Sequence, residues 1–174
     1  MRSLADGHEK IAVLTTQPED PSQPTVAELN AGIDASCAIL ASDWTFGPTD
    51  SDTFAEPAVC EDSNAQSYGR SNGQFGATIF RHFATATPGQ ADATADTTFA
   101  ALKVKGTIVW VYSRLTAKKS AEAWAEDDEI RYGAEVLTDT PQPPQEAGGY
   151  IKSRVPGQVQ RAWPYIKAVT SIPG

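Results

Sequence analysis

Short runs of alternating apolar and polar residues, separated by turns rich in proline and glycine, recur along this chain. In the clearest run Phe75, Ala77 and Ile79 alternate with Gly76 and Thr78. A period of two is the pattern of a β-strand that buries one face. Twelve prolines and thirteen glycines also favour many turns and short strands over long helices. The chain is therefore predicted to be mainly β, a sandwich or partly open barrel with one or two short helices.

Seven or eight strands are expected, and their ranges follow the apolar runs. They are 10–16, 33–40 with a continuation toward 44–46, 53–60, 74–83, 107–115, 130–136, 150–162 and 165–170. Proline interrupts two of them, at Pro57 and at Pro156-Gly157. The run at 107–115 is apolar on both faces, which places it at the centre of a sheet.

Two short helices carry start and stop signals. Thr25 is placed to cap a turn that contains Glu28, its capping-box partner three residues on, and Gly32 is expected to end that turn in the left-handed conformation. Asp96 is placed to cap a second helix over 97–105, which Gly106 would end.

A length of 174 residues predicts one domain spanning 1–174. Within it we expect an N-terminal arm at about 1–24, a long loop at about 47–73 and a C-terminal tail. A loop of that length is uncommon in a compact domain and is usually functional or disordered. Phe54, Val59 and Tyr68 favour order, because each offers an apolar group that can dock.

The formal net charge of −8 argues against binding to a nucleic-acid backbone, although an acidic wall would let DNA pass without sticking. The C-terminal end is basic, with Lys152, Arg154, Arg161 and Lys167. Opposite charges at different ends suit head-to-tail association, and solvated loops are the alternative. The acidic candidates for a lumen or loop surface are Asp50, Asp52, Glu56, Glu61, Asp62, Glu126, Asp127 and Asp128.

Motifs that carry catalysis or cofactor binding are missing from the sequence. His8 and His82 are the only histidines, and there is no phosphate-binding loop or Rossmann fingerprint. The acidic clusters lack the spacing of a calcium loop. We therefore expect no enzyme activity, cofactor or metal. Cys37 and Cys60 are expected to be reduced, partly buried thiols in a protein that folds in the cytosol without a membrane span.

Several segments together resemble the major tail tube proteins of long, non-contractile tailed (siphovirus-type) phages that infect actinobacteria. The resemblance covers most of the chain and lies in the order and spacing of its pieces. They are 24–36, 57–61 with 68–72, 78–83 with 89–92, 105–112, 148–152 and 159–163.

This resemblance implies a fold and an assembly. The fold would be two packed antiparallel sheets flanked by a short helix. Six subunits would close a ring, and stacked rings would form the conduit for DNA ejection, which DNA crosses without specific binding. The protein would belong to the virion tail, be assembled in the host cytoplasm, and contact itself, the tape measure, the tail terminator and the distal tail proteins.

Large side chains supply the candidates for contacts between subunits, since such residues dominate interfaces. They are Leu29, Trp44, Phe46, Phe54, Tyr68 and Trp163. We expect Val26 and Leu29 to hold the N-terminal arm against the sheet or a neighbouring subunit. Two alternatives stay open: another phage structural β protein (tail terminator, baseplate ring or head decoration), and a carbohydrate-binding or hydrolytic β-sandwich with tryptophans as stacking platforms.

Overall fold

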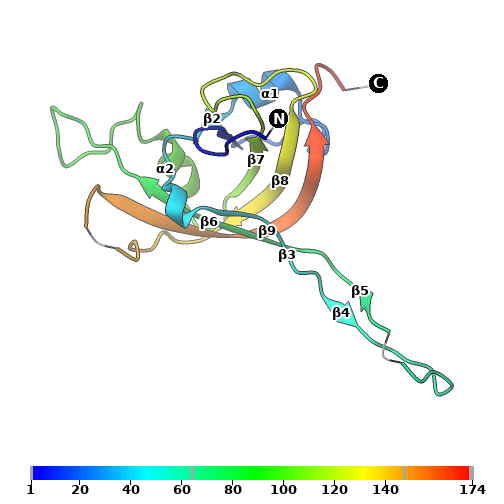
Figure 1. Ribbon diagram of the computed structural model, residues 1–174. Helices are drawn as coiled ribbons and strands as arrows, with labels where there is room; N and C mark the ends of the chain where they lie inside the picture. Colours follow the sequence, from blue (N-terminus) through cyan, green and yellow to red (C-terminus); the bar gives the residue numbers. More distant parts are fainter. Residues whose placement is uncertain (1, 64, 147, 173–174) are drawn as a thin grey trace.

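One curved antiparallel sheet of seven strands forms the body of the protein (Figure 1). The computed structural model describes residues 2–63, 65–146 and 148–172. The strand order is β2-β1-β7-β8-β9-β6-β3. The bounds are β1 Glu9–Leu14, β2 Ile33–Asp34, β3 Thr45–Thr49, β6 Asn72–Phe80, β7 Ile108–Leu115, β8 Glu129–Thr138 and β9 Lys152–Lys167, and a separate pair joins β4 Thr53–Phe54 to β5 Ser67–Tyr68.

The longest strand, β9, joins the two halves of the sheet. Its first residues pair with β6 up to Gly157, and the rest pairs with β8 from Gly157 to Lys167. The sheet bends along β9, so that β7 and β8 rise out of the plane of β6 and β3 (Figure 1). The prediction of a mainly antiparallel β protein is therefore confirmed, in a form consistent with a β-sandwich.

The predicted interruption at Pro156-Gly157 is wrong, because β9 runs through both residues. Gly157 lies where the two halves meet. A Cβ there would come within 2.7 Å of both Phe75 Cδ1 and Val136 Cγ1, so only glycine lets the halves approach this closely. A register shift between Glu135 and Val136 of β8 accompanies the bend.

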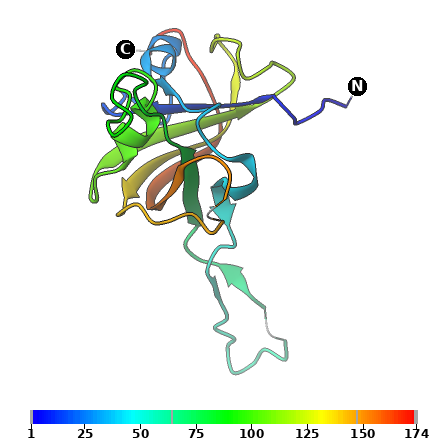
Figure 2. The ribbon, with the colours of Figure 1, turned by 90° about the vertical axis from the view of Figure 1, so that its left-hand side faces the viewer.

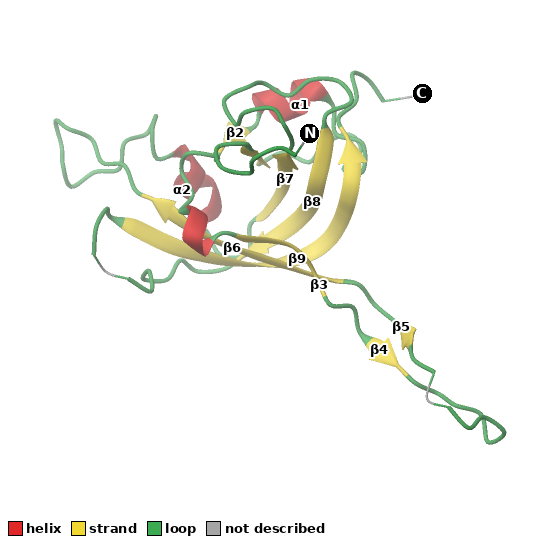
Figure 3. Ribbon diagram, viewed as in Figure 1, coloured by secondary structure: helices red, strands yellow, loops and turns green. Residues whose placement is uncertain are grey.

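The main core fills the space between the two halves. Phe75 and Ile79 of β6 face Val111 of β7 and Val136 of β8 across it. α2 Thr97–Leu102 closes the open side with Phe99 and Leu102, as Figure 3 shows in red. The predicted central strand is confirmed, since β7 lies between β1 and β8 and is buried on both faces.

A second core lies on the opposite face of β1 and β7, beneath α1 Val26–Ala31. The predicted capping box is present: Glu28 N–H donates to Thr25 Oγ1, and the Glu28 carboxylate accepts from Thr25 N–H at 2.8 Å. The prediction that Gly32 adopts the left-handed conformation is wrong, because its φ is −67°. Glycine lets the chain pass close to β1 here, because a Cβ would lie 2.9 Å from Leu14 Cδ1 and would displace that side chain.

Two expected strands are shorter in the structure. The run at 33–40 stops at Asp34, whose carboxylate accepts hydrogen bonds from the Ser36 backbone and hydroxyl and turns the chain. Ile39 then makes an isolated antiparallel bridge with Ile79 of β6, and the next strand, β3, begins at Thr45. The strand expected at 53–60 is reduced to the two residues of β4.

Asp96 occupies the N-cap position of α2, but its side chain makes no cap. The carboxylate instead binds the Arg81 guanidinium, with Nη2 at 2.9 Å, and accepts from His82 N–H. Arg81 also lies over the Phe99 ring, 3.8 Å from its centroid. The ion pair is favoured because the Asp96 carboxylate is buried and needs a counter-charge. The helix ends at Leu102, earlier than expected.

Candidate assembly surface

A long arm, residues 49–72, projects from one end of the body (Figures 1 and 2). It contains the short β4–β5 pair, in which Thr53 pairs with Tyr68 and Phe54 with Ser67. At its base the Asn72 amide donates to the Asp50 carbonyl (3.1 Å) and to the Asp52 carboxylate (2.9 Å). The predicted long loop is thus a structured projection.

The arm carries aromatic and acidic side chains that the body does not shield from solvent. Phe54 is 52% exposed and Tyr68 is 82% exposed. All five predicted acidic residues of this segment are exposed, namely Asp50, Asp52, Glu56, Glu61 and Asp62. An exposed aromatic surface of this kind is a feature of contact sites.

The other large candidates lie in or against the cores of their own subunit. Leu29 is 2% exposed in the second core, and Phe46 packs edge-on against Tyr132 in the main core. Trp44 is partly buried on the main core and donates from Nε1 to Glu9 at 2.9 Å. Trp163 is partly buried on the second core. Leu29 therefore packs within its own subunit, and its contact with a neighbouring subunit stays a prediction.

The second acidic cluster divides into exposed and bound residues. Glu126 and Asp127 are exposed, whereas the Asp128 carboxylate binds Arg114 Nη1 at 2.8 Å and Lys118 Nζ at 2.9 Å. Partial burial raises the pKa of Asp128, but hydrogen bonds from Lys118, the Ala125 N–H and Arg114 outweigh it and hold the pKa below its usual range. Asp128 is thus not a free surface charge, contrary to its place among the predicted acids.

Arg114 is a structural residue that the sequence analysis missed. It is fully buried and donates to the carbonyls of Lys119, Glu122 and Ala123 as well as to Asp128. A lone arginine inside the apolar run 107–115 is the signal that marks it, because a buried guanidinium needs several partners.

An open strand edge lies beside the base of the arm. From Gln158 onward β9 pairs only with β8, and among the described strands none pairs with its other edge. The edge borders a groove of about 450 Å³ between β9 and the arm base. Its lining includes Pro48, Thr49, Asn72, Tyr132, Val159 and Ala162.

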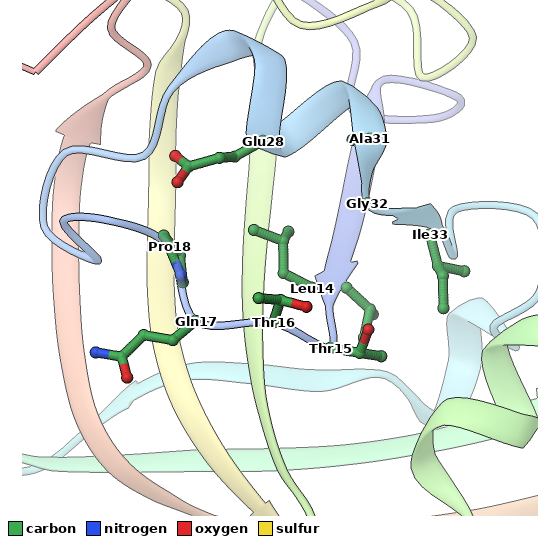
Figure 4. Close-up of a pocket in the computed structure, with 10 residues that line it drawn as sticks. Leu14, Thr15, Thr16, Gln17, Pro18, Glu28, Ala31, Gly32 and Ile33 are labelled. Atoms are coloured by element: carbon green, nitrogen blue, oxygen red, sulfur yellow. The ribbon is translucent and has the colours of Figure 1, made fainter.

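A smaller cavity of about 250 Å³ lies between the end of β1 and α1 (Figure 4). Glu28 is its only acidic side chain, and that carboxylate is already bound by Thr25 and by the Glu19 N–H. Cys37 and Cys60 are free but exposed, which corrects their predicted partial burial. No group of three or more potential metal ligands occurs within 2–63, 65–146 and 148–172.

A curved antiparallel body with an exposed, aromatic arm and an open strand edge defines the class of protein: a structural β subunit suited to association with other chains. A sequence model of the phage tail tube proteins matches residues 1–171. The chain belongs to this family, and it is a structural component of the virion tail that assembles into a tube. No curated protein matches the chain.

None of the helices described is long and apolar enough to cross a membrane.

Proposed function

We propose that this chain is the major tail tube subunit of a siphovirus-type phage that infects actinobacteria. Six copies close into a ring, and rings stack into the conduit through which DNA is ejected. Its role is structural rather than enzymatic. The observation that carries this proposal is the match to the tail tube family over residues 1–171.

The shape of the subunit supports stacking. The arm extends well beyond the body, so it can reach another subunit (Figures 1 and 2). A contact between an arm and a different surface on the next copy is heterologous, and such contacts propagate into filaments. Phe54 and Tyr68 are the interface residues that remain available for it.

Charge supports passage of DNA. The net charge of −8 opposes retention of a polyanion, because DNA-binding surfaces need a surplus of Lys and Arg. Exposed acids such as Glu126 and Asp127 are candidates for the lumen, together with those of the arm. The tape measure, tail terminator and distal tail proteins are the proposed partners inside and at the ends of the tube, which assembles in the host cytoplasm.

Electron microscopy of the concentrated protein and of the native particle tests this function. The expected image is an open-ended stack of rings with six subunits each. A single ring would favour a terminator or baseplate component, and a capsid-bound trimer would favour a decoration protein. Protein that stays monomeric at high concentration, with no ring repeat in the native particle, would contradict the proposal.

A carbohydrate-binding or hydrolytic role makes a different prediction. It requires binding on a glycan array, or hydrolysis that one acidic substitution abolishes. The tail tube subunit is expected to show neither.

A further inference from the structure

We propose that the open edge of β9, from Gln158 to Lys167, is the docking site for the arm of a second copy of this chain. The inference rests on the proposed function and goes further, because it names the surface that receives the arm. The groove between β9 and the arm base would accommodate the incoming segment.

The backbone of β9 provides the first reason. β6 follows β9 only as far as Gly157 and then turns away with β3 toward the arm. Beyond that point one edge of β9 lacks a partner strand in the described chain, while the other edge pairs with β8. Tyr165 departs from extended backbone in this stretch, with a φ of 50°. Unpaired N–H and C=O groups in an extended strand are a template for another strand, so long open edges are rarely left uncovered.

The groove beside this edge provides the second reason. It holds about 450 Å³, and its mainly polar lining includes apolar surface from Tyr132, Val159 and Ala162. Ala162 faces this groove and is exposed in the single subunit. Gly73 keeps the groove open at its base, because a Cβ there would collide with the Tyr132 hydroxyl. An apolar side chain of the arm, such as Phe54 or Tyr68, has room to pack here.

Opposite charges favour the arm as the segment that docks on the open edge of β9. β9 has no acidic residue, and its open stretch carries Arg161 and Lys167, which bind Glu135 and Asp127 within the subunit. The arm carries five acidic side chains against Arg70 alone. Arg161 remains 59% exposed while it binds Glu135, so it can also face an incoming carboxylate. Opposite charges of this kind fix the register of an interface and exclude like-charged partners.

The arm also gains from docking. Its β4–β5 ribbon has only two residue pairs, and an isolated two-stranded ribbon is marginally stable in water. Adding it to the β9 edge would give its backbone a third strand to pair with. The same contact would cover Phe54 and Tyr68, which the subunit leaves in solvent.

Photocrosslinking from the arm tests the proposal in assembled protein. Cys37→Ser leaves Cys60 of the arm as the only cysteine, and both cysteines are exposed, so the change should not disturb folding. Cys60 is labelled with benzophenone maleimide, and labelled protein is mixed with ¹⁵N-enriched protein before assembly. Mass spectrometry then identifies adducts that join two different subunits.

Adducts are expected in the tryptic peptides 155–161 and 162–167, which span the open edge. Intersubunit adducts elsewhere on the body, in tubes that electron microscopy shows to be intact, would overturn the docking site and leave the proposed function standing. Absence of any tube from the unlabelled protein would overturn both.

A matched pair of substitutions gives a second test that needs no label. Gln160 is exposed on β9, so Gln160→Glu and Gln160→Lys should both fold with unchanged thermal unfolding. The glutamate opposes the acidic arm and should raise the critical concentration for assembly about two- to fivefold, whereas the lysine should not raise it. Equal assembly of the two variants would contradict docking at this edge.

Discussion

At the scale of single residues, exposure separates the large side chains that build the subunit from those available for assembly. Leu29 and Phe54 are both apolar, and both were predicted to contact other subunits. Leu29 lies on the buried face of α1 and is 2% exposed, whereas Phe54 lies on the arm and is 52% exposed. Apolar surface stabilises whichever state removes it from water. Leu29 therefore contributes to folding, and Phe54 is left to contribute to association.

Leu29→Ala is predicted to lower the free energy of unfolding of the subunit by about 2–5 kcal/mol, because it removes buried methyl groups and leaves a cavity beside Trp124 and Ala168. Urea unfolding of the monomer measures the change. Leu4→Ala is the matched control, since Leu4 is mostly exposed and should give a change near zero. Unchanged stability of Leu29→Ala with lost assembly would return Leu29 to an interface role.

At the scale of elements, one buried arginine organises the connection between β7 and β8. Arg114 at the end of β7 donates to three carbonyls of 119–123 and to Asp128, just before β8. Lys118 joins the same carboxylate. The turn-rich connection is thus held by charge-assisted hydrogen bonds instead of by its own secondary structure.

Asp128→Asn is predicted to destabilise the protein by about 2 kcal/mol or more at neutral pH, because Arg114 then lacks its buried counter-charge. Hydrogen exchange should rise first over 116–128. Asp127→Asn is the matched control: Asp127 and its partner Lys167 are both largely exposed, so little change is expected.

The effect of Asp128 should depend on pH in a defined direction. Its pKa is lowered in the folded protein, so its contribution is present above the unfolded pKa, about 3.9, and is lost as the pH falls through the lower folded value. The stability difference between the native protein and Asp128→Asn should therefore shrink below about pH 4. A difference that stays constant from pH 6 to pH 3 would contradict this assignment.

At the scale of the whole molecule, the subunit has a bent body that holds both cores and an arm that exposes two aromatic side chains, Phe54 and Tyr68. The described part of the arm joins the body at its base, through β3 and β6 (Figure 1). Changes beyond that base should therefore affect association without unfolding the body.

Tyr68→Ser is predicted to leave thermal unfolding unchanged and to reduce the yield of sedimentable tubes, because it removes an exposed aromatic group of the arm. Tyr150→Ser is the comparison, since Tyr150 is equally exposed but precedes β9 in the body. A loss of tubes as large for Tyr150→Ser as for Tyr68→Ser would show that the arm has no special part in assembly.

Local patterns were sufficient for much of the fold. Alternation located β6 and β8, a run apolar on both faces located β7, and Thr25 with Glu28 located α1, because these signals act within a few residues. Prediction was poorer where a distant partner decides. Asp96 occupies a cap position, but Arg81 takes its carboxylate, and Pro156-Gly157 has the composition of a turn but lies inside a strand.

The sequence by itself determined a mainly β chain with a capped first helix and the tail tube family, since periodicity, capping and the order of segments are properties of the linear chain. Only the tertiary structure decided which of six large candidates stay exposed, that Asp128 is neutralised by Arg114, and that β9 has an open edge beyond Gly157. Burial and strand pairing depend on which distant segments meet, and a sheet that bends along one strand brings together residues that no local pattern links.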